Sequence, residues 1–440
     1  MSGETYAALM FPLLFVFVFL GIPVAFALLG CAFVFGLPLF GDRIGLQMYA
    51  GITQTASQFL LSAVPPFVLM GTLLERSGIA ERLFRAMQLW LGRLPGGLAL
   101  ATMAMATVVA ASTGIVGAVE VVIGVMAIPV MLGYAYDRAL IAGTVCAGGS
   151  LGTMIPPSIV VVIYASVANM SVGQLFSAVL APSLIMVGLF FAYILLRCAI
   201  DREHGPPAAE GADLALAARL RLTLTAMVPA TLLILAVLGS IIAGIATPTE
   251  AASVGALGAL LLTIAYGRFR PGVLVDALRQ TLAINCMILL IVLGGSMFAG
   301  VFRIHGGNNL VADAIGLLDL SETGVIVLLL AVVFVFGFIL DWVSVVLICL
   351  PIFLPLLGGF GVDPLWFAVL MIIVIQTSYL TPPMAPSIFY LRSIAPPEIT
   401  YGDMYRGVLP FVLCQLLVLA LVLLFPALAT YLPQRLVPGF

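Results

Sequence analysis

Long apolar stretches run through almost the whole chain, and the polar segments between them are short. Hydrophobic residues make up 63% of the 440 positions and charged residues only 8%. A soluble domain carries roughly 25% charged residues, so this chain has too little charge to cover a surface that faces water. A helix that crosses a bilayer needs about 20 mostly apolar residues. The sequence therefore predicts an all-α polytopic membrane protein whose solvent is the lipid bilayer.

Composition also excludes several classes of function. The net charge is −2 and no basic cluster occurs, so nucleic acid is not an expected partner. The six cysteines each lie in an apolar stretch without CxxC spacing, and they are predicted to be small core residues. The two histidines, His204 and His305, lie in polar connecting segments, so no cofactor and no metal other than Na⁺ is expected. No HExxH or GxSxG motif is present, which argues against a membrane-embedded enzyme.

Polar segments divide the chain into two halves with the same order of elements, joined by an exposed cytoplasmic linker at 201–221. In the first repeat, 1–200, the expected elements are scaffold helices within 5–93 (ending in an amphipathic arm at 78–93), an interrupted hairpin at 98–132, a broken helix at 138–168 and a helix at 172–200. In the second repeat, 222–440, they are scaffold helices within 223–303, an outer arm at 304–322, an interrupted hairpin at 323–357, a broken helix at 365–392 and a helix at 406–431.

A shift of about 226 positions aligns residues that control the backbone in the two halves. It places Pro129 on Pro355, Gly133 on Gly359, Asp137 on Asp363 and Pro156-Pro157 on Pro382-Pro383. One such match would be chance among 27 prolines and 44 glycines. A Pro-Pro pair with several partners at one offset instead indicates an internal repeat.

Arginine placement predicts how the repeats are oriented. If each interrupted hairpin is re-entrant and turns back inside the membrane, each repeat makes five crossings, and this odd number inverts the second repeat relative to the first. With the 78–93 arm in the cytoplasm, only Arg43, Arg303 and Arg435 of the 17 arginines lie outside, as the positive-inside rule favours. Full crossings would put the arginines after position 132 on alternating, wrong sides. We therefore expect two inverted-topology repeats with both termini in the periplasm.

Inverted repeats with paired broken helices are typical of secondary transporters. A break frees carbonyl oxygens at the C-terminal end of one half-helix, which suit Na⁺, and N–H groups at the N-terminal end of the next, which suit a carboxylate. Proline adds to this because it has no N–H for the carbonyl one turn earlier. Each half offers one hairpin tip and one Pro-Pro break. Ion sites are expected where the tip and the break of one half meet.

The predicted site residues come from these two tips and two breaks. The first Na⁺ site is predicted at Ser112, Thr113, Gly114, Gly152, Thr153, Pro156 and Ser158. The second Na⁺ site is predicted at Asp341, Ser344, Thr377, Ser378, Thr381 and Pro382. Substrate contacts are predicted for Thr113, Ser158, Thr381 and Pro383. The alternative is that each break is a structural kink whose hydroxyls bond back to the helix.

Three acids lie within apolar stretches: Glu120, Glu250 and Asp341. An unpaired charge in lipid costs at least ~2.5–3.5 kcal/mol, so each acid should face protein or water. Asp341 adjoins the second tip, where it would either bind the ion or cap a hairpin helix. Glu250 follows a Thr-Pro-Thr sequence and is expected to cap the start of a helix. Glu120 lies about two turns beyond the first tip, and both a proton or cation role and a buried pair stay open.

Four runs of sequence make the chain resemble a known family: GSLGTMIPPSIVVVIYA, TPTEAASVGA, FILDWVSVVLICLPIFLP and YLTPPMAPSIF. They are similar to the large membrane subunit (DctM-like) of tripartite ATP-independent periplasmic (TRAP) transporters, across essentially the whole chain. ASTGIVGAVE and TPPMAPSIFYLRS most resemble the subgroup labelled mannitol/chloroaromatic-compound or 2-oxoacid transport. The first tip departs from the usual Ser-Gly-Ser-Ser because it reads Thr113-Gly114-Ile115-Val116, and Ser378 and Ala385 stand where the family usually has glycines.

The resemblance implies Na⁺-coupled import of an organic acid across the bacterial inner membrane. It implies an elevator motion, in which a transport domain of two hairpins and two broken helices slides against the scaffold helices. It also implies two partners, a small four-helix membrane subunit and a periplasmic substrate-binding protein. The alternative is a self-sufficient anion/Na⁺ symporter of the same inverted-hairpin architecture, which would need neither partner.

Overall fold

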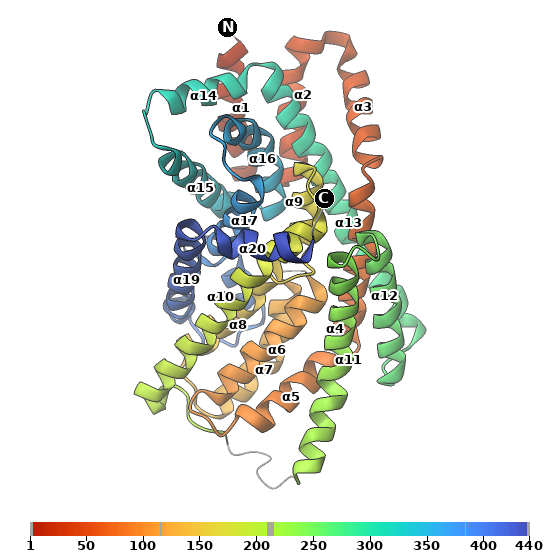
Figure 1. Cartoon of the computed structure of the whole chain (residues 1–440), viewed down its shortest axis with the longest axis vertical. Helices are drawn as coiled ribbons and strands as arrows, with labels where there is room; N and C mark the ends of the chain where they lie inside the picture. Colours follow the sequence, from red (N-terminus) through yellow and green to blue (C-terminus); the bar gives the residue numbers. More distant parts are fainter. Residues whose placement is uncertain (1–2, 115–116, 209–214, 383, 438–440) are drawn as a thin grey trace.

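The structure is a computed structural model that describes residues 3–114, 117–208, 215–382 and 384–437. All regular elements in these ranges are helices (Figure 1). Within the same ranges, nine helical stretches are long and apolar enough to cross a membrane. The prediction of an all-α polytopic membrane protein is therefore confirmed.

The helices follow one another in two comparable series. The first half contains α1 Gly3–Phe19, α2 Val24–Phe40, η1 Gly41–Arg43, α3 Ile44–Ala56, η2 Phe59–Ala63, α4 Val64–Arg76, α5 Ile79–Leu91, α6 Gly97–Thr113, α7 Ala118–Gly133, α8 Arg138–Ser150, η3 Leu151–Thr153, α9 Ile159–Ala168, α10 Val172–Ile200 and η4 Arg202–His204, where η marks a 3₁₀ helix. The second half contains α11 Leu216–Ile242, α12 Pro248–Ala265, α13 Pro271–Ile304, α14 Gly307–Gly316, α15 Glu322–Ile339, α16 Trp342–Gly359, α17 Pro364–Leu380, α18 Pro386–Ile394, α19 Tyr401–Leu424 and α20 Ala427–Leu436.

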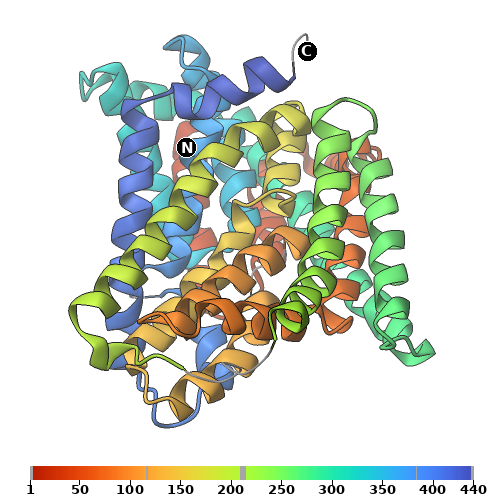
Figure 2. The same cartoon turned by 60° about the horizontal axis from the view of Figure 1, so that its bottom comes forward.

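The expected shift of about 226 positions also relates the observed helix boundaries. Position 138, where α8 begins, maps to 364, where α17 begins, and the end of α7 at 133 maps to the end of α16 at 359. Figures 1 and 2 both show α5 and its counterpart α14 at opposite ends of the molecule. The hairpin α6–α7 lies in the lower half of Figure 1 and the hairpin α15–α16 in the upper half. This opposite placement is what an inverted repeat produces.

Some helix boundaries differ from the predicted segments. Within the predicted scaffold region 223–303, α13 begins at Pro271, because proline is favoured at the first helical position and the following polar turn remains helical. The predicted single helix at 406–431 is wrong. α19 ends at Leu424, just before Pro426, and α20 is a separate helix.

The linker between the repeats is not simply an exposed connector. The Gly96 N–H donates to the Gly205 carbonyl at 2.8 Å, and the Ala208 N–H donates to the Gly92 carbonyl at 2.8 Å. Gly205 and Ala208 are both buried. The linker is therefore bound to the loop before α6 at these two residues, where the prediction of exposure is wrong, whereas Arg202, Glu203 and Pro207 are exposed as predicted.

Helix packing divides the molecule into two groups. α2 packs against α13, and α4 packs against both α12 and α13. We call α1–α4 and α11–α13 the α13 group. α6–α10 and α15–α20 also pack mainly among themselves, for example α8 against α19 and α15 against α17, and we call them the hairpin group. The two groups meet where α16 packs on α13 and where α6 packs on α4.

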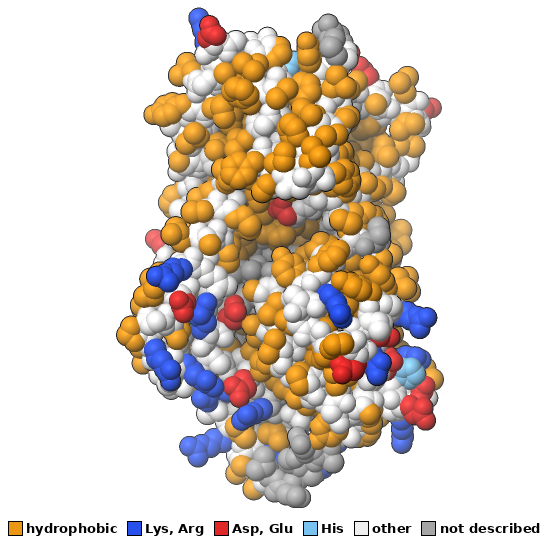
Figure 3. All heavy atoms as spheres, turned by 180° about the vertical axis from the view of Figure 1, so that it is seen from behind, with side chains coloured by type: hydrophobic (Ala, Val, Ile, Leu, Met, Phe, Trp, Pro, Cys, Tyr) orange, Lys and Arg blue, Asp and Glu red, His pale blue; other side chains and the backbone are white. Residues whose placement is uncertain are grey.

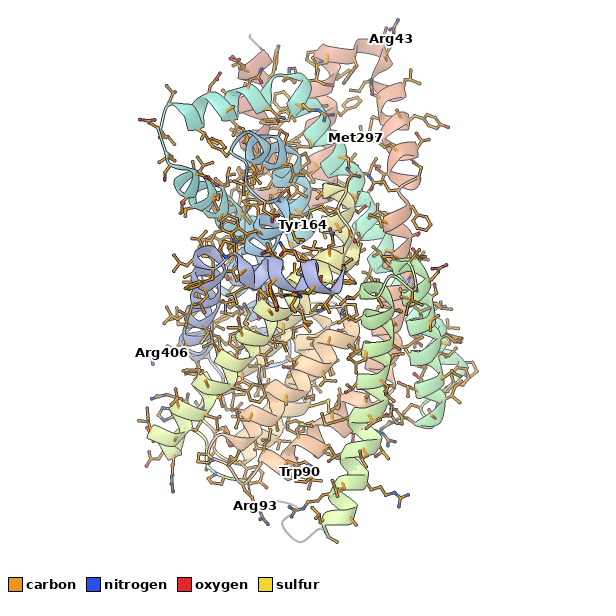
Figure 4. The ribbon with its side chains drawn as sticks, viewed as in Figure 1. Arg43, Trp90, Arg93, Tyr164, Met297 and Arg406 are labelled. Carbon is orange, nitrogen blue, oxygen red and sulfur yellow. The ribbon has the colours of Figure 1, made fainter. Side chains whose placement is uncertain are left out.

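Charged side chains are distributed unevenly along the molecule. On the face seen in Figure 3, Arg side chains gather over the lower half, while the upper half is mostly hydrophobic and carries scattered acidic side chains and a basic one at the top. Figure 4 shows Arg43 and Arg93 at opposite ends. The predicted orientation places Arg43 in the periplasm and Arg93 in the cytoplasm, and their positions at opposite ends agree with it.

Candidate functional site

The first hairpin tip lies directly against the first break. α6 ends at Thr113, and Gly114 follows with a left-handed backbone, φ +60°. A Cβ atom at Gly114 would lie 2.8 Å from the Pro157 carbonyl oxygen and 3.2 Å from the Ile159 nitrogen. Only glycine allows the tip to approach the break this closely. The next two positions of the tip, Ile115 and Val116, lie outside the described residues.

The first break leaves main-chain oxygens without their helical donors. Pro156 and Pro157 lie one turn after Gly152 and Thr153, and neither proline has an N–H to donate to those carbonyls. The Ser158 hydroxyl donates to the Thr153 carbonyl instead, at 2.7 Å. The Gly152 carbonyl thus lacks its helical donor at the point where the tip meets the break.

The second tip is organised by Asp341. Its carboxylate accepts hydrogen bonds from the N–H groups of Val343 at 3.0 Å and Ser344 at 3.3 Å. The Ser344 hydroxyl also donates to the carboxylate, at 2.5 Å. Asp341 therefore caps the start of α16, one of the two roles predicted for it. Its side chain also borders the cavity described below.

The second break also ends a helix before a proline pair, but the carbonyls of Thr377 and Ser378 keep hydrogen-bond donors. α17 ends at Leu380, and Pro382 lies one turn after Ser378. The Ser378 carbonyl accepts from the Thr381 N–H at 3.2 Å, and the Thr381 hydroxyl donates to the Thr377 carbonyl at 2.6 Å. A Cβ atom at Gly337, near the end of α15, would overlap the Ser378 hydroxyl. The second hairpin therefore reaches the second break, as predicted.

The two breaks lie beside each other in the hairpin group. The Gln376 amide nitrogen and the Ser150 hydroxyl oxygen are 3.3 Å apart and form a hydrogen bond. These residues are 226 positions apart, so they occupy equivalent places in the two repeats. A contact between equivalent residues places the pseudo-two-fold axis next to both breaks.

A cavity of about 900 Å³ lies where the two tips, the two breaks and the α13 group meet. Its wall includes Gly114 and Asp341 from the tips and Ser378 from the second break. It also includes the first residues of five helices, which are Val24 of α2, Ala118 of α7, Ile159 of α9, Trp342 of α16 and Pro386 of α18. Helix N-termini carry partial positive charge and unpaired N–H groups. Asp341 already caps α16, but the other four N-termini have no side-chain cap and make the cavity suited to an anion.

Several predicted site residues lie behind the cavity wall. Among the described wall residues, the predicted set contributes only Gly114, Asp341 and Ser378. The other predicted residues are near but do not line it: Ser112, Thr113, Gly152, Thr153, Pro156, Ser158, Ser344, Thr377, Thr381 and Pro382. Of the predicted substrate contacts, Thr113 and Ser158 are buried and Thr381 is half-buried, whereas Pro383 lies outside the described residues.

The hydroxyl groups at both breaks donate to helix carbonyls, as the kink alternative predicted. The donors are Ser112, Thr113, Thr153, Ser158, Thr377, Ser378 and Thr381, with distances of 2.6 to 3.0 Å. A hydroxyl that donates its hydrogen keeps its oxygen lone pairs free to accept. The bonds therefore fix the hydroxyl orientation and are compatible with coordination of a cation.

Sequence reasoning missed much of the cavity wall. α13 contributes Ile284, Met287 and Ile291, and α18 contributes Phe389 and Tyr390. The α13 residues carry no signal in the sequence, because an apolar side chain facing a cavity and one facing lipid are the same residue types. The aromatic residues of α18 follow the second Pro-Pro pair directly, and that proximity could have indicated them.

Comparison with known protein families identifies the family of this chain. The family model "Tripartite ATP-independent periplasmic transporter, DctM component" matches residues 11–428. The chain belongs to this family. Because the family is a transporter component, this TRAP subunit is a multi-pass membrane protein and is not an enzyme.

Characterised TRAP proteins match this subunit over nearly its full length. The ectoine/5-hydroxyectoine TRAP transporter large permease protein UehC of Ruegeria pomeroyi is 29% identical, covering 97% of this chain and 98% of that one. The sialic acid TRAP transporter large permease protein SiaM of Vibrio cholerae is 29% identical, covering 94% and 96%. The C4-dicarboxylate TRAP transporter large permease protein DctM of Pseudomonas aeruginosa is 29% identical, covering 87% and 88%.

A solved structure shares the fold. The crystal structure of the Alcanivorax borkumensis YdaH transporter superimposes with a TM-score of 0.63 at 17% sequence identity. The match covers 93% of this chain and 97% of that chain. The architecture of the TRAP subunit is thus one that a known transporter uses.

The remaining acids of this TRAP subunit have different roles. Glu250 forms a capping box with Thr247, because the Thr247 N–H donates to its carboxylate at 2.8 Å and the Glu250 N–H donates to the Thr247 hydroxyl at 3.3 Å. The predicted capping role of Glu250 is confirmed. Glu120 is fully buried, and its carboxylate accepts from the Ser387 hydroxyl at 2.6 Å.

Cysteine placement differs in part from expectation. Cys31, Cys146, Cys198 and Cys349 are buried as predicted, whereas Cys286 on α13 is exposed. An exposed small apolar side chain on a spanning helix is compatible with contact to lipid. In the part of the chain that the structure describes, no three His, Cys, Asp or Glu side chains gather as a metal site requires.

Proposed function

We propose that this chain is the large membrane subunit of a Na⁺-coupled TRAP transporter that imports an organic acid across the bacterial inner membrane. The observation that carries the proposal is the cavity of about 900 Å³ on which two hairpin tips and two broken helices converge. Such convergence at repeat interfaces is how secondary transporters build substrate and ion sites.

The charge distribution around the cavity supports an anionic substrate. Four helix N-termini without a side-chain cap line it, and the described wall residues include no arginine. A carboxylate would therefore be bound by main-chain N–H groups and helix dipoles. The relatives named above carry ectoine, sialic acid and C4-dicarboxylates, each of which has at least one carboxylate. An organic acid is the substrate class that fits both observations.

Na⁺ coupling follows from the electrostatics of the same wall. Asp341 places a negative charge at the second tip, where it would repel a substrate carboxylate. A Na⁺ ion bound beside Asp341 and the second break would neutralise that charge. Binding of the cation then favours binding of the anion, which is the coupling a symporter needs. At the first break, the Gly152 carbonyl is the corresponding oxygen that lacks its helical donor.

The partners and the orientation are part of the proposal. The tripartite family description supports a small four-helix membrane subunit and a periplasmic substrate-binding protein. The gathering of arginines at one end of the molecule supports a cytoplasmic location for that end and periplasmic termini (Figures 3 and 4).

Uptake into proteoliposomes tests this function. The chain is reconstituted into proteoliposomes with its small subunit. The binding protein and one of three radiolabelled probes are added outside: ectoine, sialic acid or a C4-dicarboxylate. We expect uptake of at least one probe with an inward Na⁺ gradient and none when choline replaces Na⁺. An uptake rate that is unchanged when choline replaces Na⁺ would contradict Na⁺ coupling. Uptake without the binding protein would instead support the self-sufficient symporter.

An elevator motion is proposed between the hairpin group and the α13 group. Their boundary is formed at close range by glycines: a Cβ at Gly71 of α4 would lie 2.8 Å from the Thr113 carbonyl oxygen, and a Cβ at Gly295 of α13 would lie 2.6 Å from the Leu347 Cβ. At both contacts the glycine leaves one of the two surfaces without a side chain, which lowers the barrier to sliding. The proposed transport domain is the hairpin group, and the proposed scaffold is the α13 group.

A reversible cross-link across this boundary tests the motion. In a background without native cysteines, Gly295→Cys and Leu347→Cys place two thiols across the boundary; their Cβ atoms would start 2.6 Å apart and must separate by about 1 Å to reach the spacing of a disulfide. Oxidation should abolish uptake, and reduction should restore it. The control pair Gly294→Cys and Leu28→Cys links α13 to α2 inside the α13 group, where the Cβ atoms would start 3.1 Å apart. Full uptake after oxidation of the first pair would contradict relative movement of the two groups.

A further inference from the structure

A buried carboxylate outside the predicted Na⁺ sites joins three elements of the hairpin group. Glu120 lies in the first turn of α7 and is fully buried. Its Oε1 accepts the hydrogen bond from Ser387 of α18 at 2.6 Å. A Cβ atom at Gly149 of α8 would overlap the Glu120 Cγ. The Glu120 side chain therefore occupies space that is open because α8 has a glycine at this position. The sequence thus makes room for this acid between the first hairpin and both broken helices.

One of the two oxygens of the Glu120 carboxylate has no hydrogen-bond partner among the described residues. The second oxygen, Oε2, is buried and receives no hydrogen bond from the described residues. No arginine or histidine of the described chain forms an ion pair with Glu120. Arg392, which is the arginine on α18, instead donates to the Ile399 carbonyl at 3.1 Å and lies over the Tyr401 ring. An unpaired carboxylate in such a place costs several kcal/mol, so the group must carry a neutralising ion.

The other ionisable groups near Glu120 do not supply that charge. Those that interact with Glu120 are Cys146 of α8, Tyr379 of α17 and Tyr390 of α18, all neutral when protonated, while α6 has no titratable residue. Arg138, at the start of α8, lies about three helical turns from Gly149, where Glu120 packs. On α5, which touches α7, Glu81 pairs with Arg85 at 3.1 Å and Arg82 lies over the Tyr266 ring. Asp341 at the second tip interacts with Tyr390 and adds only negative charge.

The surroundings favour a proton over a metal cation. A bound Na⁺ needs several oxygen ligands, whereas Ser387 is the only described residue whose oxygen forms a hydrogen bond with the Glu120 carboxylate. A proton needs only the carboxylate itself: one O–H bond forms on Oε2 and the charge disappears. The position is also accessible in principle, because Ala118 and Pro386, which flank Glu120 and Ser387 in sequence, line the cavity.

We propose that Glu120 is a proton-binding site of the transport cycle, protonated in the packed state described here and deprotonated when Na⁺ binds to the hairpin group. The proposal rests on the Na⁺-coupled function above and adds a second ion to it. Like charges close together in a protein disfavour each other. Na⁺ binding at the breaks therefore releases the Glu120 proton to water, and loss of Na⁺ allows a proton from water to rebind.

Infrared spectroscopy tests the proton itself, without any substrate. The full chain is placed in lipid nanodiscs, and its spectrum is compared with that of Glu120→Gln, which keeps the size of the side chain and an oxygen for Ser387. The difference at neutral pH should contain the C=O band of one protonated carboxylic acid. Ser387→Ala removes the single donor to the charged form, so the band should persist into more alkaline buffer. A carboxylate band in its place would overturn the proposal.

Sodium binding tests the exchange. With radioactive Na⁺ as the probe, half-saturation of the wild-type chain should rise as the buffer becomes more acidic, approaching about tenfold per pH unit if the two ions exclude each other. Glu120→Gln should bind Na⁺ with little pH dependence, and the control Glu250→Gln, which alters an exposed helix cap, should behave as wild type. Equal pH dependence in wild type and Glu120→Gln would overturn the exchange. If no variant binds Na⁺, the proposed Na⁺ function fails, while the infrared band still decides the proton site.

Discussion

Replacement of Gly114 by alanine gives the sharpest test of the first ion site. The residue ends α6 with φ +60°, a region in which an L residue with a Cβ atom costs about 1–2 kcal/mol. The added Cβ would also lie 2.8 Å from the Pro157 carbonyl oxygen. This neighbour is main chain at a proline and cannot rotate away. Either the tip or the break must therefore move.

The expected effect is a loss of Na⁺ affinity and not only of stability. The strain acts at the contact between the tip and the break, where the cation is proposed to bind. If the bound state requires that contact, 1–2 kcal/mol corresponds to about a five- to thirty-fold increase in the Na⁺ concentration for half-maximal uptake. The steric contact with the Pro157 carbonyl oxygen would increase the loss of Na⁺ affinity further.

Gly41→Ala is the matched control. Gly41 also has positive φ, +52°, but a Cβ there would meet nothing within 4 Å. With ψ −132°, an alanine at Gly41 carries at least as much backbone strain as one at Gly114, without the contact, and Gly41 lies far from the breaks in sequence. Sodium-dependent uptake and thermal unfolding are measured for both variants. If Gly114→Ala and Gly41→Ala have the same Na⁺ half-saturation, the assignment of the first tip to an ion site is refuted.

Three further substitutions test other parts of the account. Thr381→Val removes the hydroxyl at the second break and should weaken Na⁺ dependence several-fold, whereas Thr263→Val, in α12, should not; equal effects would count against the second break as a site. Asp341→Ala removes both the cap of α16 and the charge beside the cavity, so Na⁺ half-saturation should rise more than for Thr381→Val; an unchanged value would exclude Asp341 from coupling. Thr247→Ala breaks the capping box and should lower the free energy of unfolding by about 1 kcal/mol while leaving Na⁺ half-saturation unchanged; a changed half-saturation would contradict a purely structural cap.

Residues whose chemistry acts on their own backbone could be interpreted from the sequence. Proline pairs end helices by removing donors, and the breaks lie where Pro156 and Pro382 predict them. Glu250 was predicted to cap a helix because a Thr-Pro-Thr sequence precedes it, and the capping box is present. These inferences need no knowledge of tertiary structure.

Contacts between distant segments could not be predicted in the same way. Ser387 lies 267 positions from Glu120, and nothing local marks it as the partner. The apolar residues of α13 that line the cavity have the same residue types as those that face lipid. The boundary of α19 was missed because the apolar pattern continues past Leu424 although Pro426 ends the helix.

Equilibrium binding of radioactive Na⁺ to the purified chain in lipid nanodiscs tests the central claim most directly, namely that the tips and breaks around the cavity hold the coupling cation. The account predicts saturable binding in choline buffer, partly lost in Gly114→Ala and unchanged in Gly41→Ala. Binding by the wild-type chain no greater than that of empty nanodiscs would contradict it.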